Sequence, residues 1–251
     1  MILDDLRNNP AIKDKIYYQN ENGILFNADC MEILKHIPDK AIDLILTDPP
    51  YGINYLSHRT DNHDKIKNDG LEDWLGNLPK WLKEFSRIIS DLGCCCCCCC
   101  GGGKTPVTAI FTLEAIKYLK LIQTLVWRKF IGLGWRYRPA YENIVILARD
   151  ENNYNFFDET KSCSNVIENI NQDIPNAEEH PTQKPVALME KLLIIHSQKD
   201  YLVLEPFAGG GATLVACERL GRKWIGIELE PKYCEIAKQR ILAEYNQIKM
   251  F

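Results

Sequence analysis

The tetrapeptide Asp48-Pro49-Pro50-Tyr51 combines residue types that could hold a planar base carrying an amino group. It follows the apolar run Ala41–Thr47, which is typical of a buried strand, and its two prolines end ladder hydrogen bonding there. The Asp48 carboxylate and the Pro49 carbonyl would accept hydrogen bonds from the amino group, and Tyr51 would stack on the ring. Taken alone, the tetrapeptide also fits a turn followed by a packed tyrosine.

A glycine-rich turn is the second chemical feature of the chain. The segment Glu205-Pro-Phe-Ala-Gly-Gly-Gly211 stands between an apolar run that begins at Tyr201 and a helical pattern that begins at Ala212. Glycines in such a turn let the backbone approach a ligand closely. The next predicted strand ends at Glu228, and an acidic residue about 20 residues beyond the glycines can accept hydrogen bonds from ribose hydroxyls. The turn alone would suit any nucleotide, but with Glu228 it favours an adenosine-containing ligand.

Five motifs follow one another over about residues 24–240: Asn27-Ala-Asp29-Cys30, Asp48-Pro-Pro-Tyr51-Gly52, His180-Pro-Thr-Gln-Lys-Pro185, Glu205-Pro-Phe-Ala-Gly-Gly-Gly211 and Gly226-Ile-Glu228. In this order they resemble the DNA amino-methyltransferases of the permuted β group, in which the catalytic motif precedes the cofactor motif. The resemblance implies the α/β, Rossmann-like fold of S-adenosylmethionine-dependent methyltransferases. Its sheet would have seven strands, mainly parallel, with one strand reversed.

The resemblance also implies roles for individual residues. Asp48, Pro49, Pro50 and Tyr51 would be catalytic. S-adenosylmethionine would be the cofactor, with Thr182 and Lys184 reaching its methionine end; the full binding set would be Asp29, Thr182, Lys184, Glu205, Pro206, Phe207, Gly209, Gly211 and Glu228. No metal is expected. The strand before Asp29 would lie beside the strand that ends at Glu228, although the two are far apart in the chain.

The expected reaction is methylation of N6 of adenine in DNA by direct in-line transfer. The amino nitrogen is a poor nucleophile because its lone pair is delocalised into the ring, and two acceptors would favour the geometry that localises it. The chain lacks a Pro-Cys dipeptide, the nucleophile signature of enzymes that methylate cytosine carbon. Methylation of cytosine N4 stays open, although an aspartate at position 48 resembles the adenine enzymes more. A non-catalytic DNA-binding relative is a remoter alternative.

Double-stranded DNA is the expected partner, and its target base must be flipped out of the stack to react. Two basic groups are candidate DNA contacts: His58, Arg59, Lys65 and Lys67 after the catalytic motif, and Arg128, Lys129, Arg136 and Arg138 interleaved with Trp127, Trp135 and Tyr137. The second group would fit equally well at a solvent-exposed edge of the sheet, where the arginine stems cover apolar surface and their charged ends reach water. A homodimer and a cognate restriction endonuclease are further candidate partners.

The elements that must position these residues alternate between strands and helices, as in βαβ units. Strands are predicted at Gly23–Asn27, Ala41–Thr47, Leu125–Lys129, Asn143–Ala148, Tyr201–Leu204 and Lys223–Ile227. The strands Leu125–Lys129 and Asn143–Ala148 would form an antiparallel pair at one edge. Helices are predicted at Met31–His36, Leu71–Ser90, Thr112–Thr124, Ala187–His196, Ala212–Leu220 and Pro231–Tyr245. One methyltransferase domain over residues 1–251 is expected, with 150–179 as a short target-recognition insertion.

Seven of the eleven cysteines form one run, Cys94–Cys100. Cysteine is small, apolar and often buried, so the run is interpreted as a buried central strand, with a low-complexity loop as the alternative. Such a run cannot form a disulfide framework, which indicates a reducing compartment. The following Gly101-Gly-Gly-Lys104-Thr105 raises the alternative of a phosphate-binding loop of an NTPase. Cys98 stands where that motif needs a glycine, which argues against it, and stabilisation by ATP would revive it.

The bulk composition agrees with a globular α/β protein. The chain has 251 residues, 46% of them hydrophobic and 25% charged, with a formal net charge of −4. This charge does not exclude DNA binding, because a DNA-binding footprint is a local basic patch. No apolar run is long enough to span a bilayer and no signal peptide is recognisable, so a cytoplasmic location is expected.

Overall fold

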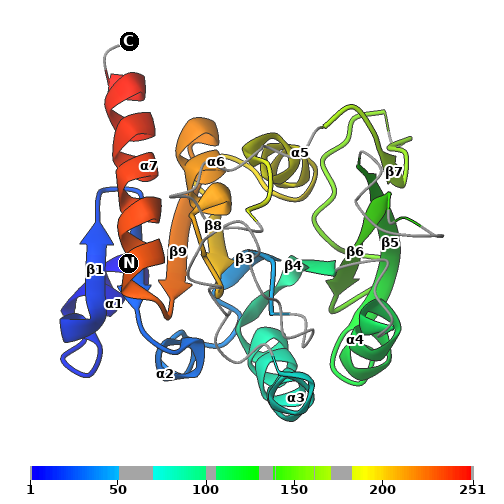
Figure 1. The fold of residues 1–251 in the computed structure, drawn as a ribbon, viewed down its shortest axis with the longest axis horizontal. Helices are drawn as coiled ribbons and strands as arrows, with labels where there is room; N and C mark the ends of the chain where they lie inside the picture. Colours follow the sequence, from blue (N-terminus) through cyan, green and yellow to red (C-terminus); the bar gives the residue numbers. More distant parts are fainter. Residues whose placement is uncertain are drawn as a thin grey trace.

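The computed structural model describes residues 2–50, 70–99, 106–129, 138, 140–160, 162–170 and 183–249 of the chain. Within these ranges the strands form a nine-stranded sheet in the order β1-β2-β9-β8-β3-β4-β6-β5-β7 (Figure 1). The strands are β1 (Ile16–Gln19), β2 (Gly23–Asn27), β3 (Ile42–Thr47), β4 (Ile89–Cys99), β5 (Lys120–Arg128), β6 (Tyr141–Ala148), β7 (Val166–Ile167), β8 (Leu202–Glu205) and β9 (Lys223–Glu228).

The inner seven strands have the predicted arrangement. Strands β2, β9, β8, β3 and β4 run parallel, and β6 is antiparallel to both of its neighbours, β4 and β5. From β2 to β5 the sheet is therefore mainly parallel with one reversed strand. Two short strands extend it beyond the predicted seven: β1 pairs antiparallel with β2, and β7 pairs parallel with β5.

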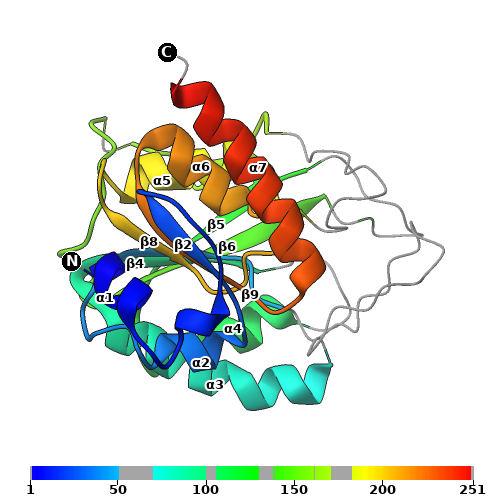
Figure 2. The same ribbon diagram turned by 90° about the vertical axis from the view of Figure 1, so that its left-hand side faces the viewer.

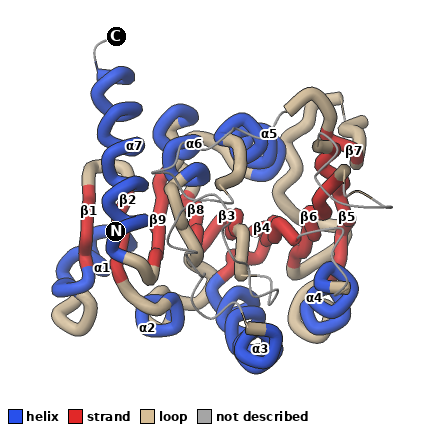
Figure 3. The backbone as a smooth tube through the Cα atoms, in the orientation of Figure 1, coloured by secondary structure: helices blue, strands red, loops and turns tan. Residues whose placement is uncertain are grey.

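Helices cover both faces of the sheet, giving three layers (Figures 2 and 3). One face packs against α1, α2, α3 and α4, and the other against α5, α6 and α7. The described helices are α1 (Ile2–Asn8), the 3₁₀ turn η1 (Lys13–Lys15), α2 (Cys30–Leu34), α3 (Leu71–Ile88), α4 (Val107–Ala115), α5 (Val186–His196), α6 (Ala212–Leu220) and α7 (Pro231–Lys249). No helix in the described ranges is long and apolar enough to cross a membrane.

The cysteine run is a buried strand of this sheet, as predicted. Strand β4 lies between β3 and β6, so both of its edges are hydrogen-bonded. Its side chains alternate between the two faces. Cys95 and Cys97 pack with the helices of one layer, whereas Cys94, Cys96 and Cys98 pack with those of the other. These five cysteine side chains are fully buried, and they fill both cores as small apolar side chains would.

The permuted pairing of β2 and β9 is confirmed. The two strands run parallel and in register from Gly23 beside Trp224 to Asn27 beside Glu228. The contact requires a glycine at position 23, because a Cβ atom there would lie 2.1 Å from the Trp224 ring. Strand β8 then pairs with both β9 and β3, which connects the first and last parts of the chain in one sheet.

The helix predicted over Thr112–Thr124 is wrong in its second half. Helix α4 ends at Ala115, and residues from Lys120 onward belong to β5. The β-branched Ile122 and Thr124 favour an extended backbone, and pairing along the whole of β6 holds them there. The elements α1, β1 and β7 were not predicted.

Candidate active site

Asp48 follows the last residue of β3, at the edge where the parallel strands of the sheet end. The same edge carries the ends of β8, at Glu205, and β9, at Glu228, because all three strands run in the same direction. Ligands of open α/β sheets bind at this edge. The fold therefore brings the predicted catalytic motif and the glycine-rich turn together.

Glu205 connects the catalytic strand to the glycine-rich turn. Its Oε1 accepts hydrogen bonds from the Thr47 hydroxyl at 2.7 Å and from the Phe207 backbone N–H at 3.1 Å, and its Oε2 accepts one from the Thr213 hydroxyl at 2.9 Å. The side chain is buried. Burial raises the pKa of Glu205 to about 8, although these hydrogen bonds lower it. Glu205 thus fixes the start of the turn and of α6 relative to β3.

Asp48 is paired with Lys184, which stands two residues before α5. The Lys184 Nζ atom lies 2.6 Å from Asp48 Oδ2 and 3.4 Å from Glu142 Oε2. Glu142, on β6, is also paired through Oε1 with Lys129 Nζ at 2.5 Å. Burial raises the pKa of Asp48 to about 6, against the lowering effect of the Lys184 ammonium. Burial also acts to raise the pKa of Glu142, but Lys184 and Lys129 together lower it below its usual range.

The glycine-rich turn is closed onto the end of β9. The Gly209 backbone N–H donates to Glu228 Oε2 at 2.7 Å, and the Glu230 N–H donates to Oε1 at 2.8 Å. Gly209 and Gly211 both have positive φ, of 49° and 78°, which a residue with a side chain rarely adopts. Burial raises the pKa of Glu228. The turn is therefore a preformed backbone loop with a carboxylate at its base.

Asp29 and Phe207 each lie two residues past the end of a strand, Asp29 after β2 and Phe207 after β8. Asp29 caps α2, its Oδ1 accepting from the Met31 N–H at 2.8 Å, and it lies two residues past the Asn27–Glu228 pairing. The Phe207 ring stacks edge-to-face on Trp81 of α3, with 4.9 Å between ring centroids. Sequence reasoning selected Asp29 and Phe207 but not Trp81, whose signal is only one apolar position of an amphipathic helix.

The structure distributes the other predicted residues unevenly. Pro49 and Pro50 follow Asp48, and Pro206 follows Glu205, at the same edge. Lys184, predicted at the methionine end of the cofactor, contacts Asp48, and its cofactor role stays a prediction. Seven predicted site residues lie outside the described ranges: Tyr51, His58, Arg59, Lys65, Lys67, Arg136 and Thr182.

The second basic group is partly neutralised. Arg128 pairs with Glu168 at 2.7 Å on the surface, and Lys129 is turned inward to Glu142. Arg138 is exposed. Trp127 is buried and its indole N–H donates to the Ile170 carbonyl at 2.9 Å, so its ring packs in the core. Trp135 and Tyr137 lie outside the described ranges.

Glu142 is the main site residue that the sequence reasoning missed. A signal for it exists, since it is the one charged residue in the strand Tyr141–Ala148. Its partners could not be read from the sequence, because they depend on β6 lying beside β4. Among the described residues, no group of three or more His, Cys, Asp or Glu side chains could hold a metal ion.

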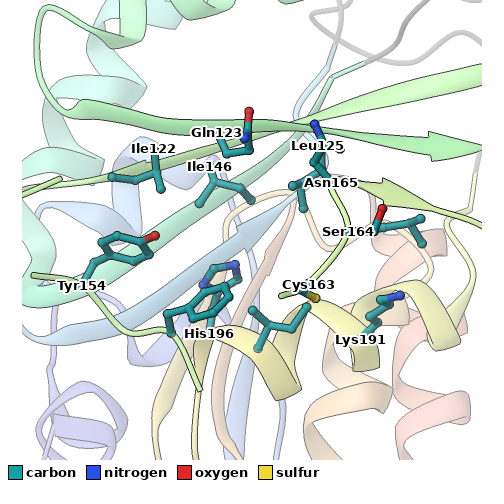
Figure 4. A pocket seen from close by; sticks show the side chains of 13 residues that line it. Ile122, Gln123, Leu125, Ile146, Tyr154, Cys163, Ser164, Asn165, Lys191 and His196 are labelled. Atoms are coloured by element: carbon teal, nitrogen blue, oxygen red, sulfur yellow. The ribbon is translucent and has the colours of Figure 1, made fainter. Parts of the chain in front are cut away.

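A pocket of about 210 Å³ lies apart from this edge, between β5, β6, α5 and the segment around residues 154–165 (Figure 4). Its walls are largely apolar, with Ile122, Ile146 and Ile195 among them. His196 also lines it, buried, with Nδ1 2.9 Å from the Asn155 carbonyl. No predicted catalytic or cofactor residue lines this pocket.

The comparisons with known proteins agree with this geometry. A family model described as DNA methylase, for N6 and N4 methyltransferases, matches residues 42–239. The type II methyltransferase M.HpaI of Haemophilus parainfluenzae is 27% identical, over 88% of this chain and 75% of that protein. The DNA adenine methyltransferase YhdJ of Escherichia coli K12 is 26% identical, over 89% of this chain and 84% of that protein.

Two solved structures share the fold. The complex of M1.HpyAVI with S-adenosylmethionine is 25% identical, with a TM-score of 0.65 over 86% of this chain and 98% of that one. The PvuII DNA methyltransferase, specific for cytosine N4, is 20% identical, with a TM-score of 0.72 over 93% of this chain and 95% of that one. The family model covers most of the chain and includes both halves of the site, so the protein belongs to the N6/N4 DNA methylase family of S-adenosylmethionine-dependent methyltransferases.

Proposed function

We propose that this protein transfers the methyl group of S-adenosylmethionine to N6 of adenine in double-stranded DNA. The observation that carries the proposal is the position of Asp48. Its carboxylate stands at the end of β3, and the Thr47–Glu205 hydrogen bond ties that strand to the turn at the end of β8. An acceptor for the amino group and a loop for the cofactor thus share one edge of the sheet.

The residues of this edge fit an adenosyl ligand. Each carboxylate oxygen of Glu228 accepts one hydrogen bond from a backbone N–H. A carboxylate can accept about four hydrogen bonds in all, so Glu228 can also bind ribose hydroxyls. Phe207 offers an aromatic ring beside the loop, and the glycines allow close approach of the backbone. Asp29, Lys184, Glu205, Pro206, Gly209 and Gly211 complete the described part of the proposed cofactor set. When bound, the cofactor supplies an electrophilic methyl group.

Asp48 would act on the amino group of the flipped base. In its ionised form it accepts a hydrogen bond from one N–H while the Pro49 carbonyl accepts from the other, which localises the nitrogen lone pair. Once the nitrogen has gained the methyl group it carries a positive charge and must lose a proton. The Asp48 carboxylate is positioned to take that proton, and a pKa of about 6 suits both roles near neutral pH.

The choice of adenine is supported by the aspartate at position 48 and by the likeness to a DNA adenine methyltransferase. The same two acceptors would also hold the N4 amino group of cytosine. The test is to express the protein in a host that lacks DNA methylation and to sequence the genome for modified bases. N6-methyladenine within one sequence motif is the expected result. Detection of N4-methylcytosine would show that the target is cytosine N4 and not adenine N6.

Asp48→Ala is the matched control for that experiment. It should abolish methylation while S-adenosylmethionine binding, measured by calorimetry, persists, because Asp48 contacts the base rather than the cofactor loop. If the unaltered protein binds both S-adenosylmethionine and DNA but leaves the host DNA unmethylated, the protein is a non-catalytic relative. Base flipping with stacking on Tyr51, a homodimer, a cognate restriction endonuclease and target recognition by residues 150–179 stay predictions.

A further inference from the structure

Four charged side chains of alternating sign form a chain that ends at the proposed catalytic carboxylate. Lys129 contacts Glu142 at 2.5 Å, Glu142 contacts Lys184 at 3.4 Å, and Lys184 contacts Asp48 at 2.6 Å. The four come from separate segments: the end of β5, the start of β6, the residues before α5 and the end of β3. The family motifs include Asp48 and Lys184 but not Glu142 or Lys129.

The inner two members are buried, with 8% of the Glu142 side chain and 5% of the Lys184 side chain exposed. Removing two such charges from water has a large desolvation penalty, and apolar residues of similar volume often stabilise a core as well or better. Stability alone is therefore a weak reason for this chain of charges. Its contact with Asp48 gives a functional reason.

We propose that Glu142 is a positioning residue of the active site, which holds the Lys184 ammonium against one oxygen of Asp48 and is itself anchored by Lys129. This role presupposes that Asp48 is the catalytic acceptor. The Lys184 stem is long and flexible, and one short contact to Asp48 would leave it several rotamers. The second anion, Glu142, restricts the ammonium to the line between the two carboxylates. The 3.4 Å distance makes this an electrostatic contact rather than a well-aligned hydrogen bond.

The consequence for Asp48 is a fixed orientation and a tuned charge state. Lys184 occupies the side of Oδ2, so the carboxylate plane is set before the base arrives. Four charged or titratable groups face Asp48 in the described structure: Lys184, Glu142, Lys129 and Glu205. Lys184 and Lys129 lower the pKa of Asp48, and Glu142 raises it. Removing the Glu142 charge should therefore move the pKa of Asp48 downward where Lys184 keeps its contact, and upward where Lys184 is released.

Glu142→Gln tests this role, because it keeps the shape of the side chain and removes the charge. We expect kcat to fall at least about tenfold, as misplaced catalytic groups do, while KM for S-adenosylmethionine changes little. The acid limb of the kcat–pH profile should move: to lower pH where Lys184 keeps its contact with Asp48, and to higher pH where it loses that contact. Glu142→Asp keeps the charge and should recover part of kcat and the original acid limb. If Glu142 acts through Lys184, Glu142→Gln and Lys184→Gln should be strongly non-additive in kcat.

Glu218→Gln is the matched control. Glu218 is also a buried glutamate, bound by Asn20, Asn22 and Trp224 beside the β2 and β9 strands, and it lies outside the active site. Its replacement likewise exchanges a buried carboxyl group for an amide, but away from Asp48. We expect it to leave kcat and the pH profile unchanged.

The outcomes separate this inference from the proposed function. Unaltered kcat and acid limb in Glu142→Gln, with Asp48→Ala inactive, would overturn the role of Glu142 alone. Normal turnover in Asp48→Ala would overturn both. If Glu142→Gln does not fold, Lys129→Met provides the test, because it removes only the outer ion pair of Glu142. A smaller fall in kcat at constant KM for S-adenosylmethionine would support the role of Glu142. A kcat equal to that of the unaltered protein would contradict it.

Discussion

The Thr47 hydroxyl donates a hydrogen bond of 2.7 Å to Glu205, a residue 158 positions further along the chain. Both side chains are buried, and they join the strand before the catalytic motif to the strand before the glycine-rich turn. Any shift of β3 against β8 would break this bond, and a hydrogen bond of this kind contributes about 1 kcal/mol to stability. The relative position of the two motifs is therefore fixed inside the sheet.

Glu205 should make the protein less stable as pH rises. Its pKa is about 8 in the folded protein and ordinary in the unfolded chain, so unfolding releases a proton between about pH 4.5 and 8. The free energy of unfolding should fall across this window by on the order of 1 kcal/mol per pH unit from this group, and level off above it. Glu205→Gln cannot lose a proton and should show a shallower dependence in urea denaturation. Parallel curves for the two proteins would contradict the assignment.

Asp48 should set the acid limb of activity. The carboxylate must be ionised to accept from the amino group, and its pKa is about 6, so the single-turnover rate should rise as pH passes through about 6. Lys184→Gln removes the cation between two buried carboxylates and should move this limb to higher pH. A limb that stays near pH 6 in Lys184→Gln would mean that another group titrates.

Gly211 should resist substitution more strongly than a helical glycine. Its φ is 78°, and a Cβ atom would lie 2.8 Å from the Ala237 Cβ of α7, so Gly211→Ala should lower the free energy of unfolding by about 1–3 kcal/mol. Gly76 lies inside α3, and nothing lies within 4 Å of a Cβ atom placed there. Gly76→Ala should raise stability by about 0.5–1 kcal/mol. Urea denaturation of both variants measures the difference, and equal effects would refute it.

The remaining arginines of the second basic group should contribute to DNA affinity. Arg128 and Lys129 are paired with carboxylates and Arg138 is exposed, so the prediction is made for Arg138 together with Arg136. Changing both to Gln should weaken DNA binding and lower the slope of log K against log salt concentration by about 1.8, from roughly 0.9 per phosphate. Fluorescence anisotropy at several salt concentrations measures this slope. Unchanged affinity and slope would assign these arginines to a solvated edge.

The sequence predicted the elements whose residues carry their own periodicity. Strand β2 was placed at its observed bounds, and α6 likewise, because each has a clear apolar pattern and a turn residue at its end. Strands β1 and β7 have four and two residues, too few for a period of two to be recognised. The helix predicted over Thr112–Thr124 failed in its second half because the apolar spacing there suits a helix, while pairing with β6 decides the conformation from Lys120 onward.

The candidate site divides in the same way. Asp48 and Glu228 were found because each stands at the end of a predicted strand, and parallel strands present their ends at one edge. Glu205 was found through the family resemblance of its motif. The pairing of Glu142 with Lys184 could not be found, because it joins side chains of elements whose neighbourhood only the assembled sheet determines. Long-range polar contacts of this kind leave no local pattern in the sequence.

The order β2-β9-β8-β3 has a consequence for synthesis on the ribosome. Strands β2 and β3 emerge early, but their places in the sheet are separated by two strands that are made about 150 residues later, since β8 begins at Leu202. Until then each half of the sheet has an open edge that can pair with other chains. A nascent chain would carry its catalytic motif long before it could bind a cofactor. The protein could methylate DNA only after β9 has inserted between β2 and β8.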